Sequence, residues 1–155
     1  IREKVLVKEH PDYASSLNSL ANLYKDMGNY EKAEPLCLES KAIREKVLGK
    51  EHRDYASSLY NLAILYKDMG NYEKAEPLYL ESKAIREKVL GKEHPDYASS
   101  LNSLTNLSKP MGNSEKAELL CLESKAIREK VLGKEHPDYA SSLFYNAILY
   151  KHMDN

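Results

Sequence analysis

The chain has 155 residues, enough for one domain with a substantial core, and its charges nearly cancel, with 23 Lys and Arg against 24 Asp and Glu. A nucleic-acid-binding protein needs a basic surface, which this composition does not supply. No apolar run reaches the length of a membrane span, and no signal peptide is visible. Two cysteines in no metal-ligand or disulfide spacing favour the cytoplasm. We therefore expect a cytoplasmic protein that binds neither nucleic acid nor membrane.

The sequence repeats itself with a period of 42 residues. The copies span 1–42, 43–84 and 85–126, and a shorter copy spans 127–155. The first copy differs from the second at six positions and from the third at six. Self-similarity at this period is typical of repeat proteins in which each unit packs on its neighbours. We expect one repeat array, and because the first residue is Ile rather than Met, a fragment of a longer one.

Each copy contains two helical segments separated by a glycine. In the first copy, the segment from Asp12 to Met27 places its apolar residues on one stripe at helical spacing, and Gly28 follows as a residue free to adopt positive φ. The second segment runs from Tyr30 to about Leu48, and Asn29 can cap its start. We call these segments helix A and helix B. One such pair cannot bury its apolar faces alone, so consecutive pairs are expected to stack.

The spacing of apolar residues in each copy resembles the tetratricopeptide repeat. The first copy reads Leu17-x2-Leu20-Ala21-x2-Tyr24, then Gly28, then Ala33-x3-Cys37. The 42-residue form, with "YEKAEPLYLESKAIREKVLG" and "HPDYASSLYNLAILY", is similar to the repeats of kinesin light chains. Cys37 and Cys121 depart from this family, which prefers a large aromatic residue there, as at Tyr79. The resemblance implies an all-α, right-handed superhelical solenoid of stacked antiparallel helix pairs, whose A helices line a concave groove that binds peptides or partner proteins.

The run "EHPDY" opens helix A in three copies and reads "EHRDY" in the second. His-Pro-Asp also occurs in J-domain co-chaperones and His-Arg-Asp in protein kinases. Here the run recurs every 42 residues, and no phosphate-binding glycine loop accompanies it. Proline is tolerated in the first helical turn, and aspartate there complements the helix dipole. We interpret the run as the junction between repeats.

No combination of residues in the sequence is typical of catalysis or metal binding. The four junction histidines are one repeat apart, about 10 Å for packed helices, whereas a zinc ligand lies about 2.1 Å from its metal. Cys37 and Cys121, two repeats apart, are expected to be buried small hydrophobes. No acid–base pair or nucleophile arrangement is present. We therefore predict that the chain is not an enzyme and that it uses no cofactor and no metal.

The side of helix A opposite its apolar stripe varies between copies. Asparagines occupy it in the first and third copies, aromatic and aliphatic residues occupy it in the second and fourth, and each copy adds a lysine. Amides can hydrogen-bond to the backbone of an extended peptide, aromatic residues can contact apolar side chains, and lysines can form ion pairs with acidic groups. The expected ligand is an unidentified partner protein or extended peptide. The candidate groove residues are Asn18, Ser19, Asn22, Lys25, Tyr60, Asn61, Ile64, Lys67, Asn102, Ser103, Asn106, Lys109, Phe144, Tyr145, Ile148 and Lys151.

Simpler explanations of this face remain open. Exposed positions drift after duplication, and a lysine near the end of a helix complements its dipole without any ligand. The apolar residues Tyr60, Ile64, Phe144 and Ile148 argue against drift alone, because drift at exposed sites more often introduces polar residues. An alternative function from a different class is assembly: ends without polar caps favour head-to-tail stacking into a homo-oligomer.

The last two copies contain irregular residues. The third has Ser108 in place of Tyr24 and Pro110 in place of Asp26, and a proline in the last turn removes a backbone hydrogen bond. We expect its helix A to end early. In the fourth copy Asn146 stands where the other copies have leucine, so its helix A is expected to pack less well.

Overall fold

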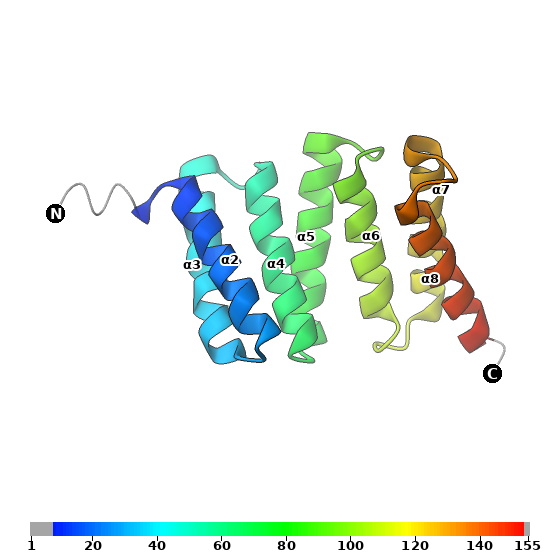
Figure 1. The fold of residues 1–155 in the computed structure, drawn as a ribbon, viewed down its shortest axis with the longest axis horizontal. Helices are drawn as coiled ribbons and strands as arrows, with labels where there is room; N and C mark the ends of the chain where they lie inside the picture. The colour runs from blue at the N-terminus through cyan, green and yellow to red at the C-terminus, as the bar shows by residue number, and fades with distance from the viewer. Residues whose placement is uncertain (1–7, 154–155) are drawn as a thin grey trace. The chain divides into compact units, whose positions relative to one another are not determined.

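The computed structural model describes residues 8–153, apart from the side chains of Tyr145, 148–150 and 152–153, and over this range it consists of helices joined by short turns (Figure 1). The even-numbered helices are the A helices, and the odd-numbered helices are the B helices. Their bounds are α2 Pro11–Asp26, α3 Tyr30–Leu48, α4 Arg53–Asp68, α5 Tyr72–Leu90, α6 Pro95–Ser108, α7 Ser114–Leu132 and α8 Pro137–Met153. The predicted all-α class is confirmed, and the segments predicted in the first repeat agree with α2 and α3 to within one residue.

The chain divides into two compact units, residues 1–85 and 86–155, with the boundary inside α5. In the first unit α2 packs against α3 and α3 against α4, and neighbouring helices run antiparallel (Figure 1). In the second unit α6 packs against α7 and α7 against α8. Each unit therefore buries its apolar stripes by stacking consecutive helices. None of the helices in the described range is long and apolar enough to cross a bilayer.

Each A helix begins with the same histidine cap. At the start of α2, Nδ1 of His10 accepts a hydrogen bond from the backbone N–H of Asp12 at 3.2 Å. The histidines before α4, α6 and α8 accept the equivalent bond at 3.1 Å. Arg53 replaces the proline at the start of α4, yet α4 has the same 16-residue length as α2. The junction interpretation is confirmed, because the histidine ring serves as a helix cap in every repeat.

Glycine ends the A helix by adopting positive φ. Gly28, with φ of 72°, directs the N–H of Asn29 to the carbonyl of Tyr24 at 2.8 Å, which closes α2. The Asn29 side chain then caps α3 by accepting from the N–H of Lys32 at 3.3 Å. The turn between helices A and B is thus determined by residues within a few positions of one another.

Both cysteines lie in the core. Cys37 on α3 and Cys121 on α7 are free thiols that are 3% and 0% exposed. Burial raises the pKa of Cys37 to about 11, although the charge of Lys25 opposes the shift, and burial also raises the pKa of Cys121. A thiol reacts as its thiolate, so both side chains are protonated and unreactive at neutral pH while the helices stay packed. The prediction that they are buried hydrophobes is confirmed.

The A helix of the third repeat ends early, as predicted. α6 stops at Ser108, two residues earlier in the repeat than α2 and α4, just before Pro110. At the position of Ser108, α4 has Tyr66, whose hydroxyl donates to the Glu34 carboxylate on α3 at 2.7 Å. Serine is too short for such a bond, and Ser108 instead donates back to a carbonyl of its own helix at 2.8 Å. Pro110 therefore shortens α6, and Ser108 lacks the link to another helix that Tyr66 makes.

The A helix of the fourth repeat carries a polar residue in its packed side. Asn146 on α8 is 8% exposed, whereas the leucines at this position on α4 and α6, Leu62 and Leu104, are 2% and 1% exposed. Neither polar atom of the Asn146 amide has a hydrogen-bond partner within the described part of the chain. A buried polar atom without a partner is destabilising. The expectation that this helix packs less well is confirmed.

Candidate functional site

A buried arginine of helix α3 joins the two A helices of the first unit. Arg44 is 7% exposed; its Nη2 donates to Ser15 Oγ on α2 at 2.9 Å. Its Nη1 donates to the carbonyl of Asp54 at 3.0 Å and to Ser58 Oγ at 3.1 Å, both on α4. A planar guanidinium holds its donors in a fixed fork, which suits partners on two helices. Burial lowers the pKa of Arg44 from its ordinary value, and the nearby Asp54 carboxylate partly opposes this shift.

The same arrangement, which we call the arginine clamp, occurs in the other repeats. Arg86 and Arg128 are 6% and 8% exposed and donate to the equivalent carbonyl and hydroxyl on α6 and α8 at 2.9 to 3.1 Å. A buried serine four residues before each arginine bonds to the A helix of its own repeat. These bonds run from Ser40 to the carbonyl of Ala14 at 2.8 Å, from Ser82 to that of Ala56 at 2.8 Å, and from Ser124 to that of Ala98 at 3.3 Å. Serine therefore fixes the helix pair, and arginine fixes the next A helix to it.

Sequence analysis did not identify the clamp arginines, because a charged residue on a helix is usually assigned to solvent. A signal was nevertheless present in the periodicity of helix B. Ala33, Cys37, Ser40 and Arg44 follow one another at helical spacing, and all four are buried. Ser40 and Arg44 thus continue the apolar stripe of helix B, and their spacing indicates that they lie in the interior with it.

The candidate groove residues of the first unit lie in different environments. Asn18 is only 7% exposed, and its Oδ1 has no hydrogen-bond partner among the described residues. Ser19 and Asn22, on the same helix, are exposed. The remaining candidates are half-buried: Lys25 on α2, and Tyr60, Asn61, Ile64 and Lys67 on α4. Asn18 therefore belongs to the interior rather than to the accessible face expected for it.

The described candidates of the second unit are half-buried or exposed. The three candidates on α6 and the lysine that follows this helix are half-buried, and on α8 Phe144 is 63% exposed and Lys151 is exposed. The side chains of Tyr145 and Ile148 lie outside the part of the chain that the structure describes. The half-buried candidates are Asn102, Ser103 and Asn106 on α6 and Lys109 directly after it.

The side chain of Asn102 is hydrogen-bonded to other residues of the fold. With its amide oxygen turned toward Arg128, Asn102 accepts from Nη1 and Nη2 at 2.6 and 2.9 Å, and its NH₂ group donates to Ser124 Oγ at 2.7 Å. This amide is then part of the arginine clamp. Asn102 therefore contributes to the packing of its repeat and has little hydrogen-bonding capacity left for a ligand.

Between repeats, the residue type at the position of Asn18 in helix A changes together with the residue type at the position of Cys37 in helix B. In the second repeat Tyr60 packs edge-on against Tyr79, with ring centroids 5.4 Å apart and an interplanar angle of 68°. The first repeat has Asn18 and Cys37 at these two positions, and the third repeat has the same two residue types. Two large side chains in one repeat replace two smaller ones in another. The difference at this position is therefore explained by packing inside the repeat.

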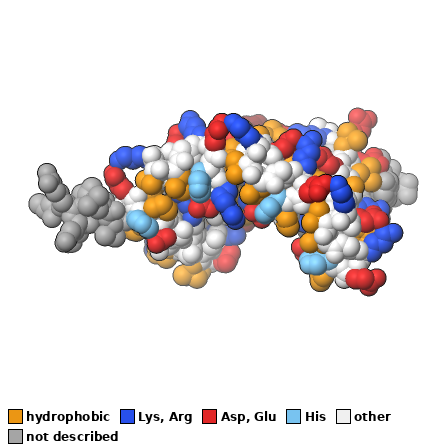
Figure 2. Space-filling model, turned by 90° about the horizontal axis from the view of Figure 1, so that it is seen from above, with side chains coloured by type: hydrophobic (Ala, Val, Ile, Leu, Met, Phe, Trp, Pro, Cys, Tyr) orange, Lys and Arg blue, Asp and Glu red, His pale blue; other side chains and the backbone are white. Residues whose placement is uncertain are grey.

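The two candidate lysines of the first unit, Lys25 and Lys67, are paired with neighbouring aspartates. Lys25 Nζ lies 3.5 Å from Asp26 and 4.0 Å from Asp68 on the adjacent A helix, and Lys67 Nζ lies 3.3 Å from Asp68. Two lysines and two aspartates cancel in charge, and Figure 2 shows basic and acidic side chains interspersed over the face in view. Ion pairs at a protein surface contribute little stability. The electrostatics of this site does not select an acidic ligand.

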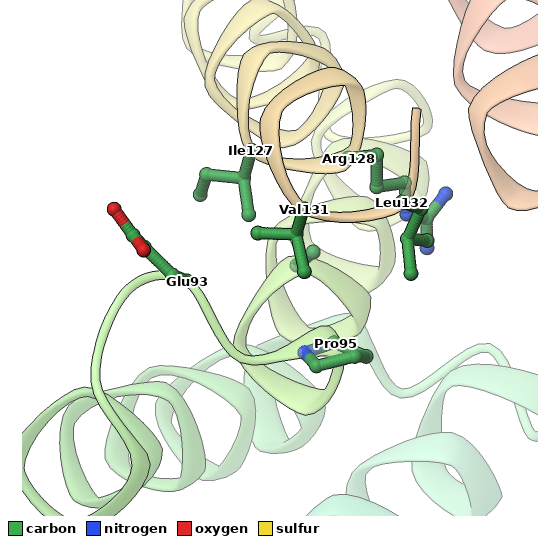
Figure 3. A pocket seen from close by; sticks show the side chains of 7 residues that line it. Glu93, Pro95, Ile127, Arg128, Val131 and Leu132 are labelled. Atoms are coloured by element: carbon green, nitrogen blue, oxygen red, sulfur yellow. The ribbon is translucent and has the colours of Figure 1, made fainter. Parts of the chain in front are cut away.

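Two hollows of the second unit offer little to a small ligand. Figure 3 shows one beside the start of α6 and the last turns of α7, and it has no room for a water molecule. The other is an open depression of about 310 Å³, where Glu93 is paired with Lys130 and Glu123 accepts from the hydroxyl of Tyr97 at 2.9 Å. Within residues 8–153 no cluster of three His, Cys, Asp or Glu side chains is placed to hold a metal.

The repeat spacing and the helix pairs are those of a known protein family. The family model described as tetratricopeptide repeat matches residues 12–87 and 56–118. The chain belongs to the tetratricopeptide repeat family. Repeats of this family mediate protein–protein interaction or assembly and typically serve as scaffolds rather than enzymes. No curated protein matches the chain in sequence.

Solved tetratricopeptide arrays have the same fold. A Podosopora anserina protein assigned to the kinesin light chains, with nearly identical TPR-like repeats, is 31% identical with a TM-score of 0.83, over 91% of this chain and 67% of its own. A single-residue variant of that protein has the same identity and TM-score, over 91% and 66%. BtubC (BKLC) from P. vanneervenii is 25% identical with a TM-score of 0.83, over 92% of this chain and 57% of its own. The chain thus spans 57 to 67% of these structures, and its repeats are of the kinesin-light-chain type.

Proposed function

We propose that the inner face of the A helices binds an extended segment of a partner protein. In the first unit we define this face as Asn22 and Lys25 on α2 and Ile64 and Lys67 on α4. The observation that carries the proposal is the alternation at one accessible position, where the repeats in order have Asn, Ile, Asn and Ile. The neighbouring difference at Tyr60 is explained by packing on Tyr79, but Asn22 is exposed and Ile64 is half-buried. Part of the side chain at this position is therefore open to an external ligand, and such a ligand would account for the alternation.

The residues of this face indicate the chemistry of the segment. The Asn22 amide can donate to and accept from a peptide backbone, and Ile64 can cover an apolar side chain. Packed helices are about 10 Å apart and an extended peptide advances about 3.3 Å per residue, so about three ligand residues span one repeat. Because Lys25 and Lys67 are already paired with aspartates, the segment need not be acidic.

The test exchanges the two residue types that the chain itself uses at this position. Peptides selected from a random phage-displayed library against the full chain are expected to bind Ile64→Asn and Asn22→Ile at least about tenfold more weakly, since each loses about one apolar or polar contact. Both variants carry a residue that another repeat tolerates, so folding is expected to be preserved, as circular dichroism will show. Affinity is measured by fluorescence anisotropy.

The matched control is Leu80→Asn on helix α5, where Leu80 is 42% exposed. This variant is expected to bind the selected peptides as the wild-type chain does. Affinities that are unchanged in both inner-face variants, or that fall only in the Leu80 variant, contradict the proposal. Raising the salt concentration is expected to change affinity only a few-fold, because the binding relies on few net charges.

A second candidate function is assembly by stacking of the array ends. Leu20 and Leu23 on α2 are 41% and 55% exposed, whereas Leu62 and Leu65, at the same positions on α4, are 2% and 1% exposed. Burying such leucines is favourable, so we expect the sedimentation-velocity mass to rise with concentration and the variant Leu23→Lys to prevent the rise. A strict monomer at about 100 μM contradicts this candidate.

A further inference from the structure

Helix α7 carries an apolar stripe on the side opposite the residues that it buries against α6 and α8. Leu119 is 70% exposed and Leu122 is 40% exposed, and Ala126 continues the stripe one turn further on. At the position of Leu119 the first two repeats have Pro35 and Pro77, which are also exposed. The side is therefore exposed in each of these repeats, and of the B helices that the structure describes, only α7 has leucine at this position. With the charged residues at its two ends, we define the outer face of α7 as Glu115, Leu119, Leu122, Ala126 and Lys130.

The outer face borders a depression of the kind that receives a side chain from a facing helix. This is the open depression of about 310 Å³ in the second unit, and Lys92 and Glu93 line one part of it. The rest of its lining belongs to α7, where the residues are Glu123, Ala126, Ile127 and Lys130. Their spacing of i, i+3, i+4 and i+7 is that of the four residues that surround one side chain in knobs-into-holes packing. The volume is roughly ten times that of a water molecule in the liquid, so an aliphatic side chain fits.

We propose that the outer face of α7 pairs with the same face of a second copy of this chain, with the two helices antiparallel. A two-fold axis between Leu122 and Glu123 lies about midway between Leu119 and the depression at Ala126 and Ile127. Leu119 of each copy then enters the depression of the other, and the two Leu122 side chains meet at the centre. Each α7 supplies both a knob and a hole, as a symmetric helix pair requires.

The charges at the ends of the outer face favour this arrangement. Glu115 lies in the first turn of α7 and Lys130 in its last turn, and both are exposed. The same two-fold axis places Glu115 of each copy opposite Lys130 of the other, whereas a parallel pair brings like charges together. Lys130 and its partner Glu93 have side chains that are 69% and 64% exposed, so Lys130 can also reach a carboxylate on a second copy. Charge complementarity therefore selects the antiparallel pair.

This contact is distinct from the stacking of array ends and from binding at the inner face. Stacking buries leucines of α2, whereas the pairing of α7 uses neither α2 nor α8. The inner face belongs to A helices, and α7 is a B helix. All measurements are therefore made in a full chain that carries Leu23→Lys, which prevents stacking and leaves α7 unchanged.

The first experiment measures dimerisation by sedimentation equilibrium. A contact between two single helices belongs to the small, transient class of interfaces, so we expect a dissociation constant of about 0.1–1 mM. Leu119→Pro is expected to weaken the dimer at least about tenfold, because it removes the side chain that enters the depression. Since α3 and α5 already carry proline at this position, the variant is expected to fold, as circular dichroism will show. If it does not fold, Leu119→Ser takes its place, with the same expected loss.

A matched pair of variants separates α7 from the other B helices. Leu122→Asn is expected to weaken the dimer about tenfold, because it removes the central apolar contact. Leu80→Asn makes the same change at the same position of α5, where Leu80 is 42% exposed, and is expected to leave the dissociation constant unchanged.

Exchange of the two end charges tests the antiparallel geometry. Glu115→Lys and Lys130→Glu each place like charges opposite one another at both ends of the pair, so each is expected to weaken the dimer about tenfold at low salt. An equimolar mixture of the two variants is expected to form a heterodimer about as stable as the original dimer, because every opposed pair again has opposite signs. A residue that only stabilises its own fold gives no such rescue.

Three results overturn the inference. The first is a strict monomer of the Leu23→Lys chain at about 1 mM. The second is a dissociation constant that is unchanged in folded Leu119→Pro or Leu119→Ser, or that falls equally in Leu122→Asn and Leu80→Asn. The third is a mixture of the two charge variants that associates no better than either variant alone.

Discussion

Replacing Arg44 with alanine is expected to lower the free energy of unfolding of the first unit by about 3–5 kcal/mol. The guanidinium makes three hydrogen bonds that join α3 to α2 and α4, and its side chain is 7% exposed. Hydrogen bonds from a charged donor contribute about 1.5–3 kcal/mol each and are not additive when one group makes them all. Truncation also leaves a cavity and a buried hydroxyl, Ser58 Oγ, with one partner fewer.

The loss is measured by urea unfolding and by the labelling rate of the Cys37 thiol in a Cys121→Ser background. Cys37 lies on the same helix as Arg44, and its raised pKa of about 11 makes it unreactive until the helix opens. The control is Lys46→Ala, which removes an exposed pair with Glu9 at 2.6 Å and is expected to change stability by less than about 1 kcal/mol.

Two further variants separate the geometry of the clamp from its charge. Arg44→Lys keeps the charge but lacks the fork, and Arg44→Met keeps much of the volume but has no donors. Both are expected to lie between the wild type and alanine, with methionine the less harmful, since it leaves no buried charge to desolvate. An alanine variant that loses less than about 1 kcal/mol would show that the clamp is not a major source of stability.

The helices could be predicted from the sequence because their boundaries depend on local residues. Gly28 and Asn29 close α2 and cap α3 through bonds to residues at most five positions away. The early end of α6 at Ser108 was predictable for the same reason, since Pro110 acts on its own helix. The same helix-ending and helix-capping signals then recur in successive copies along the chain.

The environment of the candidate site was less predictable because it depends on contacts between helices. Asn18 was expected on the accessible side of α2, but it is 7% exposed. A helix wheel shows which side of α2 a residue lies on and not how far the neighbouring helices cover that side. The clamp joins Arg44 to Ser15, 29 positions earlier in the chain, and no local pattern encodes such a contact. The pairing of Tyr60 with Tyr79 was visible only as two simultaneous differences between repeats.

Replacing Asn146 with leucine is expected to raise the free energy of unfolding of the second unit by about 2 kcal/mol. The amide is 8% exposed, and neither of its polar atoms has a partner in the described part of the chain, so folding removes both from water without compensation. Leucine occupies this position on α4 and α6 at 2% and 1% exposure, which shows that the repeat accommodates its volume. Removing the polar atoms and adding apolar contacts both raise the free energy of unfolding.

For a chain of this size the gain corresponds to a rise of about 4–8 °C in the midpoint of thermal unfolding. The control is Asn106→Leu on α6, a half-buried asparagine on an accessible face, which is expected to change stability by less than about 0.5 kcal/mol. Labelling of Cys121, 0% exposed on the helix that packs against α8, is expected to slow in the Asn146 variant only. A decrease in stability on replacing Asn146 would show that the folded chain provides its amide with a polar partner, and that leucine at this position fits the other repeats but not the fourth.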